Sequence, residues 1–364
     1  RFMIPVTKPF LPPIEEYNEL IAGIFQREWL TNNGPLVNDL ELKIKRHLGI
    51  NHLLFVGNGT IALQLAIKAL GLKGKIITTP FSYVATTSSI VWEGCEPVFV
   101  DIEPDGFNID PSKIEAAITP NVTGIIATHC FGIPCDVHAI QKIADKHNLK
   151  VIYDAAHAFG TTLEGKSIFH FGDVSTCSFH ATKVFHTIEG GAVFCKDADV
   201  HQRVQYMRNF GHDGPEKFNG VGINGKNSEF HAAMGLVNLN YLNDIFSRRK
   251  QQCTWYSSNL SRSTDLELPD VNADGWNYSY YPVIFPSEEA CILVKSKLES
   301  TEIFPRRYFF PSLNLINQWS VRSCSTSESV ASRILCLPLY HNMTEVDVQV
   351  ITKLILRNLN DFNE

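Results

Sequence analysis

The segment 175–191, STCSFHATKVFHTIEGG, places a lysine just beyond a stretch that is expected to be buried. Alternating apolar residues predict a strand that runs into His180 and Lys183, and two glycines follow Glu189. Burying an ammonium group is costly, which makes sense if the amine acts as a nucleophile. Burial would then lower the pKa of Lys183 toward neutrality. The alternative is an ordinary surface lysine on a turn.

A second candidate is the segment 151–160, VIYDAAHAFG, in which an apolar strand is predicted to end at Asp154. Open α/β sheets bind ligands at the carboxyl ends of their strands. A carboxylate there can pair with the protonated nitrogen of a pyridine ring and strengthen that ring as an electron acceptor. His157, three residues on, could reach an oxygen or the face of the same ring. The alternative role for Asp154 is N-capping of a helix.

A third candidate, GNGT, lies between a predicted strand and a predicted helix. Free backbone N–H groups at a helix start bind phosphate, here at Gly59 and Thr60, and the Thr60 hydroxyl adds a donor. Gly57, Gly59 and Ala62 also fit a relaxed dinucleotide pattern, but the acidic residue expected about 20 positions later is missing. A single phosphate is therefore favoured over NAD, and an NAD-type oxidoreductase remains an alternative.

Strands and helices alternate along the first part of the chain and place these candidates at strand ends. The predicted strands are 52–56, 75–79, 97–100, 122–128 and 150–153, extended by 175–179 and 192–195. The helices between them are predicted at 60–70, 84–93, 111–117 and 136–147. Near-continuous apolar strands in this order predict an α/β fold with a mostly parallel sheet covered by helices on both faces. Tyr83 follows one of these strands and could stack on a flat cofactor or simply pack in the core.

The pattern changes in the last third of the chain. A long helix is predicted from Ser228 to about Leu242, and a basic break follows at 248–250. We place a domain boundary near residue 245, which gives a large domain with an N-terminal arm at 1–245 and a small C-terminal domain at 246–364. The small domain holds a strand-like YSYYPVIF and predicted helices at 288–299 and 344–359.

Composition excludes several classes of function. The chain has 364 residues and a net charge of −6, and no basic stripe indicates nucleic-acid binding. Its nine cysteines are scattered and odd in number, which argues against a disulfide framework or a zinc site and favours reduced thiols in a cytoplasmic protein. No apolar run reaches the roughly 18 residues needed to span a membrane. We expect no metal.

Taken together, the order of these signals resembles a fold-type-I pyridoxal-phosphate enzyme. Over essentially its full length the chain resembles the DegT-type sugar-nucleotide aminotransferases. The matching segments are WLTNNGP, GNGTIAL, TTPFSYVAT, PVFVDI, YDAAHAFG, SFHATKVFHTIEGGA, GINGKNSEFHAAMGL and LCLPLY. The resemblance implies an aspartate-aminotransferase-like fold, with a mostly parallel seven-stranded sheet in the large domain and a smaller C-terminal α+β domain.

The resemblance also implies roles for individual residues. Lys183 matches the lysine that binds pyridoxal phosphate covalently, Asp154 matches the partner of the pyridine nitrogen, and His157 matches its companion near the cofactor oxygen. Further matches to cofactor-binding positions are Gly59, Thr60, Tyr83 and Ser178.

Asn224, in GINGK, matches an asparagine that reaches the cofactor phosphate of the neighbouring subunit, which implies a homodimer with shared active sites. Asn227 departs from the family, whose members usually carry Met there, and this puts the local packing in doubt. A branch of the family with histidine in place of the lysine dehydrates its substrate. Dehydration is disfavoured here because Lys183 is present.

The implied reaction moves an amino group from glutamate to a keto-sugar attached to a nucleotide, by way of pyridoxamine phosphate. IPVTKPFLPP and TKVFHTIEGG resemble enzymes that aminate C4 of dTDP-4-keto-6-deoxy-glucose, as in O-antigen and lipopolysaccharide synthesis. Enzymes that aminate C3 share most of these motifs and stay an alternative, as does a regulatory protein that binds the cofactor without turnover. Expected substrate contacts are Arg307, Tyr308 and His180; Arg306 and Arg307 could hold a pyrophosphate or form a solvated basic turn.

Overall fold

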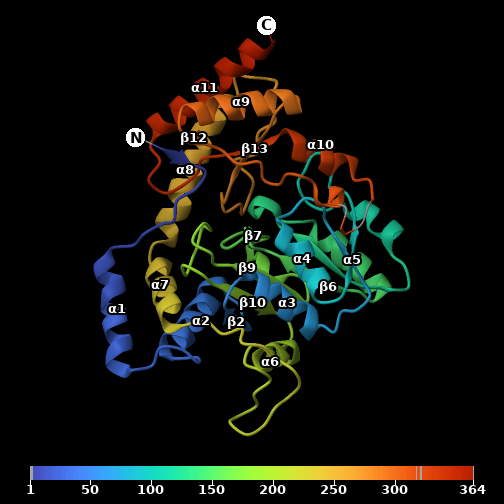
Figure 1. Cartoon of the computed structure of the whole chain (residues 1–364), viewed down its shortest axis with the longest axis vertical. Helices are drawn as coiled ribbons and strands as arrows, with labels where there is room; N and C mark the ends of the chain where they lie inside the picture. The colour runs from blue at the N-terminus through green and yellow to red at the C-terminus, as the bar shows by residue number, and fades with distance from the viewer. Residues whose placement is uncertain (1–2, 317, 320–321, 364) are drawn as a thin grey trace.

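The computed structural model describes residues 3–316, 318–319 and 322–363 (Figure 1). Its centre is a seven-stranded sheet with the order β2-β10-β9-β6-β5-β3-β4. The strands are β2 (Leu53–Val56), β3 (Lys75–Thr78), β4 (Glu96–Phe99), β5 (Val122–Thr128), β6 (Lys150–Asp154), β9 (Val174–Ser178) and β10 (Gly191–Cys195). Only β10 runs antiparallel to its neighbours in this sheet. The expected α/β fold with a mostly parallel seven-stranded sheet is confirmed.

Side chains of successive strand residues point to opposite faces of the sheet, and both faces are covered by helices. In β2, Leu53 and Phe55 pack into one core, and Leu54 and Val56 pack into the other. The first core is closed by α2 (Pro35–Leu48), α5 (Val137–His147) and α7 (Glu229–Leu239). The second is closed by α3 (Gly59–Ala69), α4 (Val84–Trp92) and α6 (Ala198–Met207). Burial on both faces explains why the strands are apolar without alternation.

Polar side chains fix where several helices begin. Ser228 caps α7, because its hydroxyl accepts the N–H of His231. The buried carboxylate of Glu229 accepts the N–H groups of Leu36 and Val37, each at 2.9 Å, and so caps α2. Ser228 therefore marks the start of a helix as predicted, and Glu229 connects that helix to the start of α2 by hydrogen bonds. The N-terminal helix α1 (Ile14–Arg27) packs against α7 (Figure 1).

A second unit with its own core follows the sheet. It comprises α8 (Leu242–Leu260), β11 (Tyr281–Ile284), α9 (Glu288–Ser300), β12 (Ile303–Phe304), α10 (Ser325–Arg333), β13 (Ile334–Leu337) and α11 (Glu345–Asn363). β11 pairs with β13 in antiparallel fashion, and α8, α9 and α11 bury their apolar faces against this pair. The remaining short strands are β1 (Ile4–Pro5), β7 (Thr162–Leu163) and β8 (Lys166–Ser167).

The division at residue 245 that we expected falls in the first turn of α8. Leu242 at the start of this helix packs into the sheet core, and Tyr256 packs into the second core. In addition, β1 pairs in parallel with β12, so the first strand of the chain belongs structurally to the C-terminal unit. The sequence-based range 1–245 therefore mixes residues of both units, because parallel pairing between distant segments leaves no local signal.

Within 3–316, 318–319 and 322–363, no helix has the length and apolar character required to cross a membrane. The same ranges contain no group of three or more His, Cys, Asp or Glu side chains arranged to hold a metal ion.

Candidate active site

A cavity of about 460 Å³ lies at the carboxyl ends of β5, β6 and β9, where the second unit faces the sheet. We call it the central cavity. Nine of the eleven predicted site residues line it: Gly59, Thr60, Tyr83, Asp154, His157, Ser178, His180, Lys183 and Tyr308. They come from five separate segments of the chain. Strand order in the sheet brings four of these segments together, and the second unit adds Tyr308.

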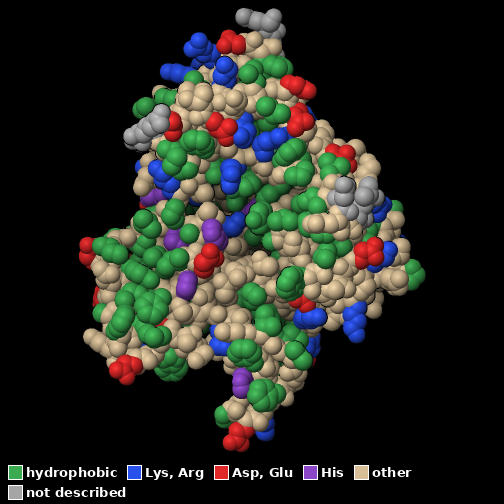
Figure 2. All heavy atoms as spheres, in the orientation of Figure 1, with side chains coloured by type: hydrophobic (Ala, Val, Ile, Leu, Met, Phe, Trp, Pro, Cys, Tyr) green, Lys and Arg blue, Asp and Glu red, His purple; other side chains and the backbone are tan. Residues whose placement is uncertain are grey.

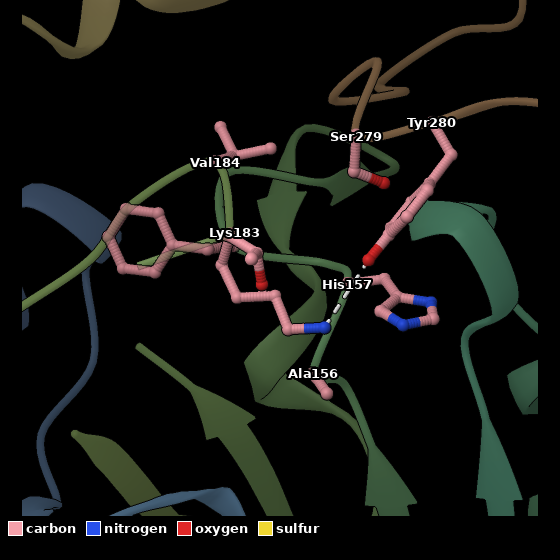
Figure 3. Close-up of a pocket in the computed structure, with 8 residues that line it drawn as sticks. Ala156, His157, Lys183, Val184, Ser279 and Tyr280 are labelled. Atoms are coloured by element: carbon pink, nitrogen blue, oxygen red, sulfur yellow. Dashed lines mark hydrogen bonds between the residues drawn. The ribbon is translucent and has the colours of Figure 1, made fainter. Parts of the chain in front are cut away.

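Lys183 lies in the loop after β9, and its side chain points into the centre of the site (Figure 3). Its amine donates a hydrogen bond to the hydroxyl of Tyr280 at 3.3 Å. Burial lowers the pKa of Lys183, but Tyr280 and then Asp154 raise it more, so this pKa lies above its ordinary value. The expectation that burial would bring the amine toward neutrality is therefore wrong for this structure. The lysine is a partly buried cation that the hydroxyl of Tyr280 holds by a hydrogen bond.

Asp154 is the last residue of β6 and is almost fully buried. Its Oδ2 accepts the hydroxyl of Thr86 at 2.6 Å, and its Oδ1 accepts the N–H of Ala156 at 3.1 Å. Burial raises the pKa of this carboxyl, and Thr86, Ala156 and Lys183 act against that rise. No helix begins after Asp154, so the N-capping alternative does not apply. The carboxylate instead faces the central cavity.

His157 is buried and held in one tautomer. Its Nδ1 accepts the backbone N–H of Phe131 at 3.1 Å. Burial, with Lys183 nearby, holds the pKa of His157 well below its usual value, so the ring is neutral. A neutral ring that accepts at Nδ1 carries its proton on Nε2. The ring lies parallel to that of Phe309, with centroids 5.6 Å apart. His157 can thus offer one N–H donor to a molecule in the cavity.

The first turn of α3 forms an anion cradle at the other side of the cavity. Asn58 caps the helix by accepting the N–H of Ile61 at 2.8 Å. Gly59 and Thr60 follow as its first residues, whose N–H groups have no acceptor within the helix. A Cβ on Gly59 would lie 3.0 Å from Cβ of Ser178, so glycine lets the helix start approach β9 closely. This arrangement suits a phosphate group.

Two predicted residues differ from the others in placement. Arg307 does not line the central cavity: its guanidinium binds Glu288 at 2.7 Å and lies 3.5 Å from the ring centroid of Phe310. The neighbouring Arg306 lines the cavity instead, together with Tyr308. Side chains of consecutive residues in extended backbone point in opposite directions, so one arginine of the pair must turn away. The sequence could not tell which one.

Asn224 also lies outside the cavity lining of its own chain and is exposed. It sits in the long connection between α6 and α7, where its backbone pairs with Asn209. Asn227, the departure from the family pattern, is buried and uses its side-chain N–H₂ to bind the carbonyl of Glu189 at 2.9 Å. Local packing is therefore satisfied, because Asn227 fixes the turn that follows Lys183.

Sequence reasoning missed Tyr280 and Thr86, and it named Arg306 only as one of two arginines that could hold a pyrophosphate. Tyr280 reaches the site because two residues just before it bind the loops that follow β6 and β5. The amide of Asn277 donates to the carbonyl of His157 at 2.7 Å, and the hydroxyl of Ser279 donates to that of Phe131 at 2.7 Å. The run YSYY was interpreted only as a strand. Its mixture of three aromatic hydroxyls with a serine and a preceding asparagine was the available signal.

Comparisons with known proteins show the family to which this chain is similar. The family model described as DegT/DnrJ/EryC1/StrS aminotransferase family matches residues 13–355. A relative from Shigella dysenteriae, named dTDP-4-amino-4,6-dideoxy-D-glucose transaminase, is 41% identical over 96% of this chain and 97% of its own length. A relative from Aneurinibacillus thermoaerophilus, named dTDP-3-amino-3,6-dideoxy-alpha-D-galactopyranose transaminase, is 28% identical over 94% of this chain and 95% of its own.

The solved structures give the same answer for the fold. The crystal structure of DesI, described as being in the presence of its TDP-sugar product, matches with a TM-score of 0.93 and 31% identity. The match covers 99% of this chain and 94% of DesI. The family match covers almost the whole chain, and the lysine, the carboxylate and the anion cradle line one cavity. Together these findings exclude the alternative of an NAD-type oxidoreductase. The chain belongs to the DegT/DnrJ/EryC1/StrS aminotransferase family.

Proposed function

We propose that this chain is a pyridoxal-phosphate aminotransferase that moves an amino group from glutamate to C4 of dTDP-4-keto-6-deoxy-glucose. The observation that carries the proposal is the convergence of Lys183, Asp154 and His157 on the central cavity, in a chain 41% identical to a transaminase named for the 4-amino sugar. The product would be a nucleotide-linked 4-amino-4,6-dideoxy sugar.

The residues of the central cavity fit pyridoxal phosphate. Cofactor sites commonly measure about 300–1,000 Å³, and this cavity has about 460 Å³. Lys183 provides an amine for the cofactor's aldehyde, and Asp154 provides a buried carboxylate for its ring nitrogen. The neutral His157 offers an N–H donor for the ring oxygen. The anion cradle at Gly59 and Thr60, with Ser178 beside it, would hold the phosphate.

The chain's own residues supply the proton chemistry. When bound, the cofactor supplies a carbonyl group that exchanges for an amine and a ring that accepts electrons. Nζ of Lys183, as base and then acid, moves the proton of the substrate carbon that carries the amino group. Tyr280 holds Nζ by its hydroxyl, and Asp154 keeps a proton on the ring nitrogen. Asp154 and His157 are buried at the base of the cavity, and reduced contact with water strengthens their interactions.

The choice of sugar carbon rests on relative similarity. The relative named for a 4-amino sugar is 41% identical, whereas the one named for a 3-amino sugar is 28% identical, at nearly the same coverage. A difference of this size over the same length favours C4. Arg306 and Tyr308 enter the central cavity from the second unit and are our candidates for the nucleotide side of the substrate.

We also propose a homodimer in which Asn224 reaches the cavity of the neighbouring subunit. Large apolar side chains are exposed on and beside α1, among them Phe25 and Trp29. Figure 2 shows hydrophobic side chains gathered over the region of that helix. The connection that carries Asn224 also exposes Phe218 and Val221. Contiguous exposed apolar surface is typical of subunit interfaces. A second copy of this chain would cover both regions. We place the enzyme in the cytoplasm, because its cysteines are free and buried.

The test is a reaction of purified protein with pyridoxal phosphate, glutamate and dTDP-4-keto-6-deoxy-glucose, with the product identified by mass and NMR. A 4-amino-4,6-dideoxy sugar nucleotide is the expected product. Amination of a 3-keto isomer instead would overturn the choice of carbon. If glutamate does not convert the bound cofactor to its amine form, the chain is a cofactor-binding regulatory protein and the enzymatic proposal fails.

A further inference from the structure

Three hydroxyl groups form a continuous chain of hydrogen bonds that ends on Asp154. Thr128 at the end of β5 donates to Ser82 at 3.0 Å. Ser82 lies 2.7 Å from the hydroxyl of Thr86 in α4. Thr86 donates to Oδ2 of Asp154 at 2.6 Å. We call Thr128, Ser82 and Thr86 the hydroxyl chain.

Donor counting fixes the direction of this hydroxyl chain. Each hydroxyl has one hydrogen to donate, and a carboxylate can only accept. Since Thr86 gives its hydrogen to Asp154, its oxygen must accept from Ser82, and Ser82 must in turn accept from Thr128. All three dipoles therefore point toward the carboxylate. Hydrogen bonds aligned in this way strengthen one another.

The alignment of these hydroxyl groups affects the charge of Asp154 because all four side chains are buried. Thr86 is fully buried, Ser82 and Thr128 are each 2% exposed, and Asp154 is 6% exposed. A buried carboxylate tends to take up a proton unless donors stabilise its charge. Thr86 and the N–H of Ala156 each occupy one lone pair of Asp154, one on each oxygen. One lone pair on each oxygen remains for a molecule in the central cavity.

We infer that Thr86, backed by Ser82 and Thr128, is a positioning residue that keeps Asp154 ionised and turned toward the ring nitrogen of the cofactor. This inference rests on the proposed function, because it needs a cofactor with a basic ring nitrogen. A protonated ring nitrogen is what makes the ring an effective electron acceptor. The hydroxyl chain would thus influence the cofactor's reactivity through Asp154, while Thr86 itself would not contact the cofactor.

The same helix offers a matched control. Thr87 is also fully buried, and within the described part of the chain its hydroxyl has no hydrogen-bond partner. Thr86→Val and Thr87→Val remove the same hydroxyl and keep nearly the same shape. Only the first change withdraws a donor from Asp154. A role in helix packing alone would make the two variants behave alike.

The experiment compares two cofactors on the full-length protein: pyridoxal phosphate labelled with ¹⁵N in the ring, and its deaza analogue with carbon at that position. In wild type we expect a ¹⁵N resonance typical of a protonated ring and tighter binding of the natural cofactor. In Thr86→Val we expect the resonance to move toward the unprotonated position. We also expect the preference over the analogue to fall roughly tenfold or more, the range for a hydrogen bond to a charged group.

Further variants complete the test. Thr86→Ser should restore the wild-type resonance and preference, and Thr87→Val should keep both. Ser82→Ala, which breaks the hydroxyl chain one bond further back, should shift the resonance in the same direction but less. A wild-type preference that survives in Thr86→Val would overturn the inference. Equal binding of both cofactors by wild type would instead overturn the pairing of Asp154 with the ring, and with it the proposed function.

Discussion

The amine of Lys183 donates a hydrogen bond to the hydroxyl of Tyr280 at 3.3 Å, although 97 positions separate the two residues. One comes from the loop after β9, and the other precedes β11 of the second unit. Figure 3 shows the two side chains directed at one another, with His157 beside them. The site is therefore built at the junction of the two units, and Tyr280 both positions the lysine and raises its pKa against the effect of burial.

Replacing Tyr280 with Phe should have two opposite effects. Loss of the hydroxyl lowers the pKa of Lys183, so a larger fraction of the amine is unprotonated near neutral pH and captures pyridoxal phosphate faster. Turnover should nevertheless fall, roughly ten- to hundredfold, because the amine is no longer held in place. Stopped-flow absorbance at a series of pH values measures capture, and the pH at which capture becomes fast should move downward.

Tyr278→Phe is the control for that change. Its hydroxyl bonds the carbonyl of Val271 and does not line the central cavity. It should leave the pH profile of cofactor capture unaltered. If both tyrosine variants show the same profile, Tyr280 does not act on Lys183.

Lys183→Ala should abolish transamination while the protein still binds the cofactor without a covalent bond. The lysine is both the attachment point and the group that moves the proton, and proton transfer by a placed side chain contributes roughly 10²- to 10⁴-fold. Mass spectrometry after borohydride reduction should find the cofactor on Lys183 in wild type and on no lysine in the variant. Turnover close to wild type in Lys183→Ala would refute the assignment.

The adjacent arginines should separate binding from stability. Arg306→Ala should raise KM for the nucleotide sugar roughly ten- to hundredfold, the cost of one charge-assisted hydrogen bond, and leave the reaction with glutamate unaltered. Arg307→Ala breaks the ion pair with Glu288 and should instead lower the free energy of unfolding by roughly 1–3 kcal/mol. Steady-state kinetics and urea unfolding on both variants measure this. The reverse pattern would restore Arg307 as the substrate contact.

Two inactive subunits should complement one another if the active site is shared. Asn224→Ala removes the group offered to the neighbour, and Lys183→Ala removes the amine of the chain's own site. A mixed dimer of the two variants then contains one complete site. Unfolding and refolding the mixture should restore part of the activity that each variant lacks alone. No recovery, with mixed dimers demonstrated by native mass spectrometry, would place Asn224 in its own subunit's site.

His129 should make the protein less stable in mild acid. Burial lowers its pKa from 6.5 to about 3. Between these values the unfolded chain binds a proton that the folded chain does not, so the free energy of unfolding falls as pH falls. One such group contributes up to about 1.4 kcal/mol per pH unit. Urea unfolding from neutral to mildly acidic pH measures the slope.

His129→Gln should flatten that slope, since glutamine does not titrate and can still accept the N–H of Cys135 that His129 Nδ1 accepts at 3.0 Å. The exposed His170 gives the control, because His170→Gln removes an imidazole that is not buried. An equal slope in the wild type and His129→Gln would show that the buried ring does not govern the acid response.

The part of the site that lies at consecutive strand ends could be predicted from the sequence. Asp154 closes an apolar strand, Gly59 begins a helix after another, and Lys183 follows a third. In a mostly parallel sheet these ends must meet along one edge. Caps such as Ser228 are equally local, because the capping hydroxyl and the N–H that it satisfies are three residues apart.

Tertiary structure alone decided the rest. Tyr280 and Thr86 reach Lys183 and Asp154 across 97 and 68 positions, and no local pattern encodes such contacts. The pKa of Lys183 followed from Tyr280 and Asp154, which outweigh the burial that the sequence already implied. Which of Arg306 and Arg307 faces the cavity depends on how the second unit docks against the sheet. Sequence determined which groups stand at the strand ends, and packing between distant segments determined their partners, their charge and their direction.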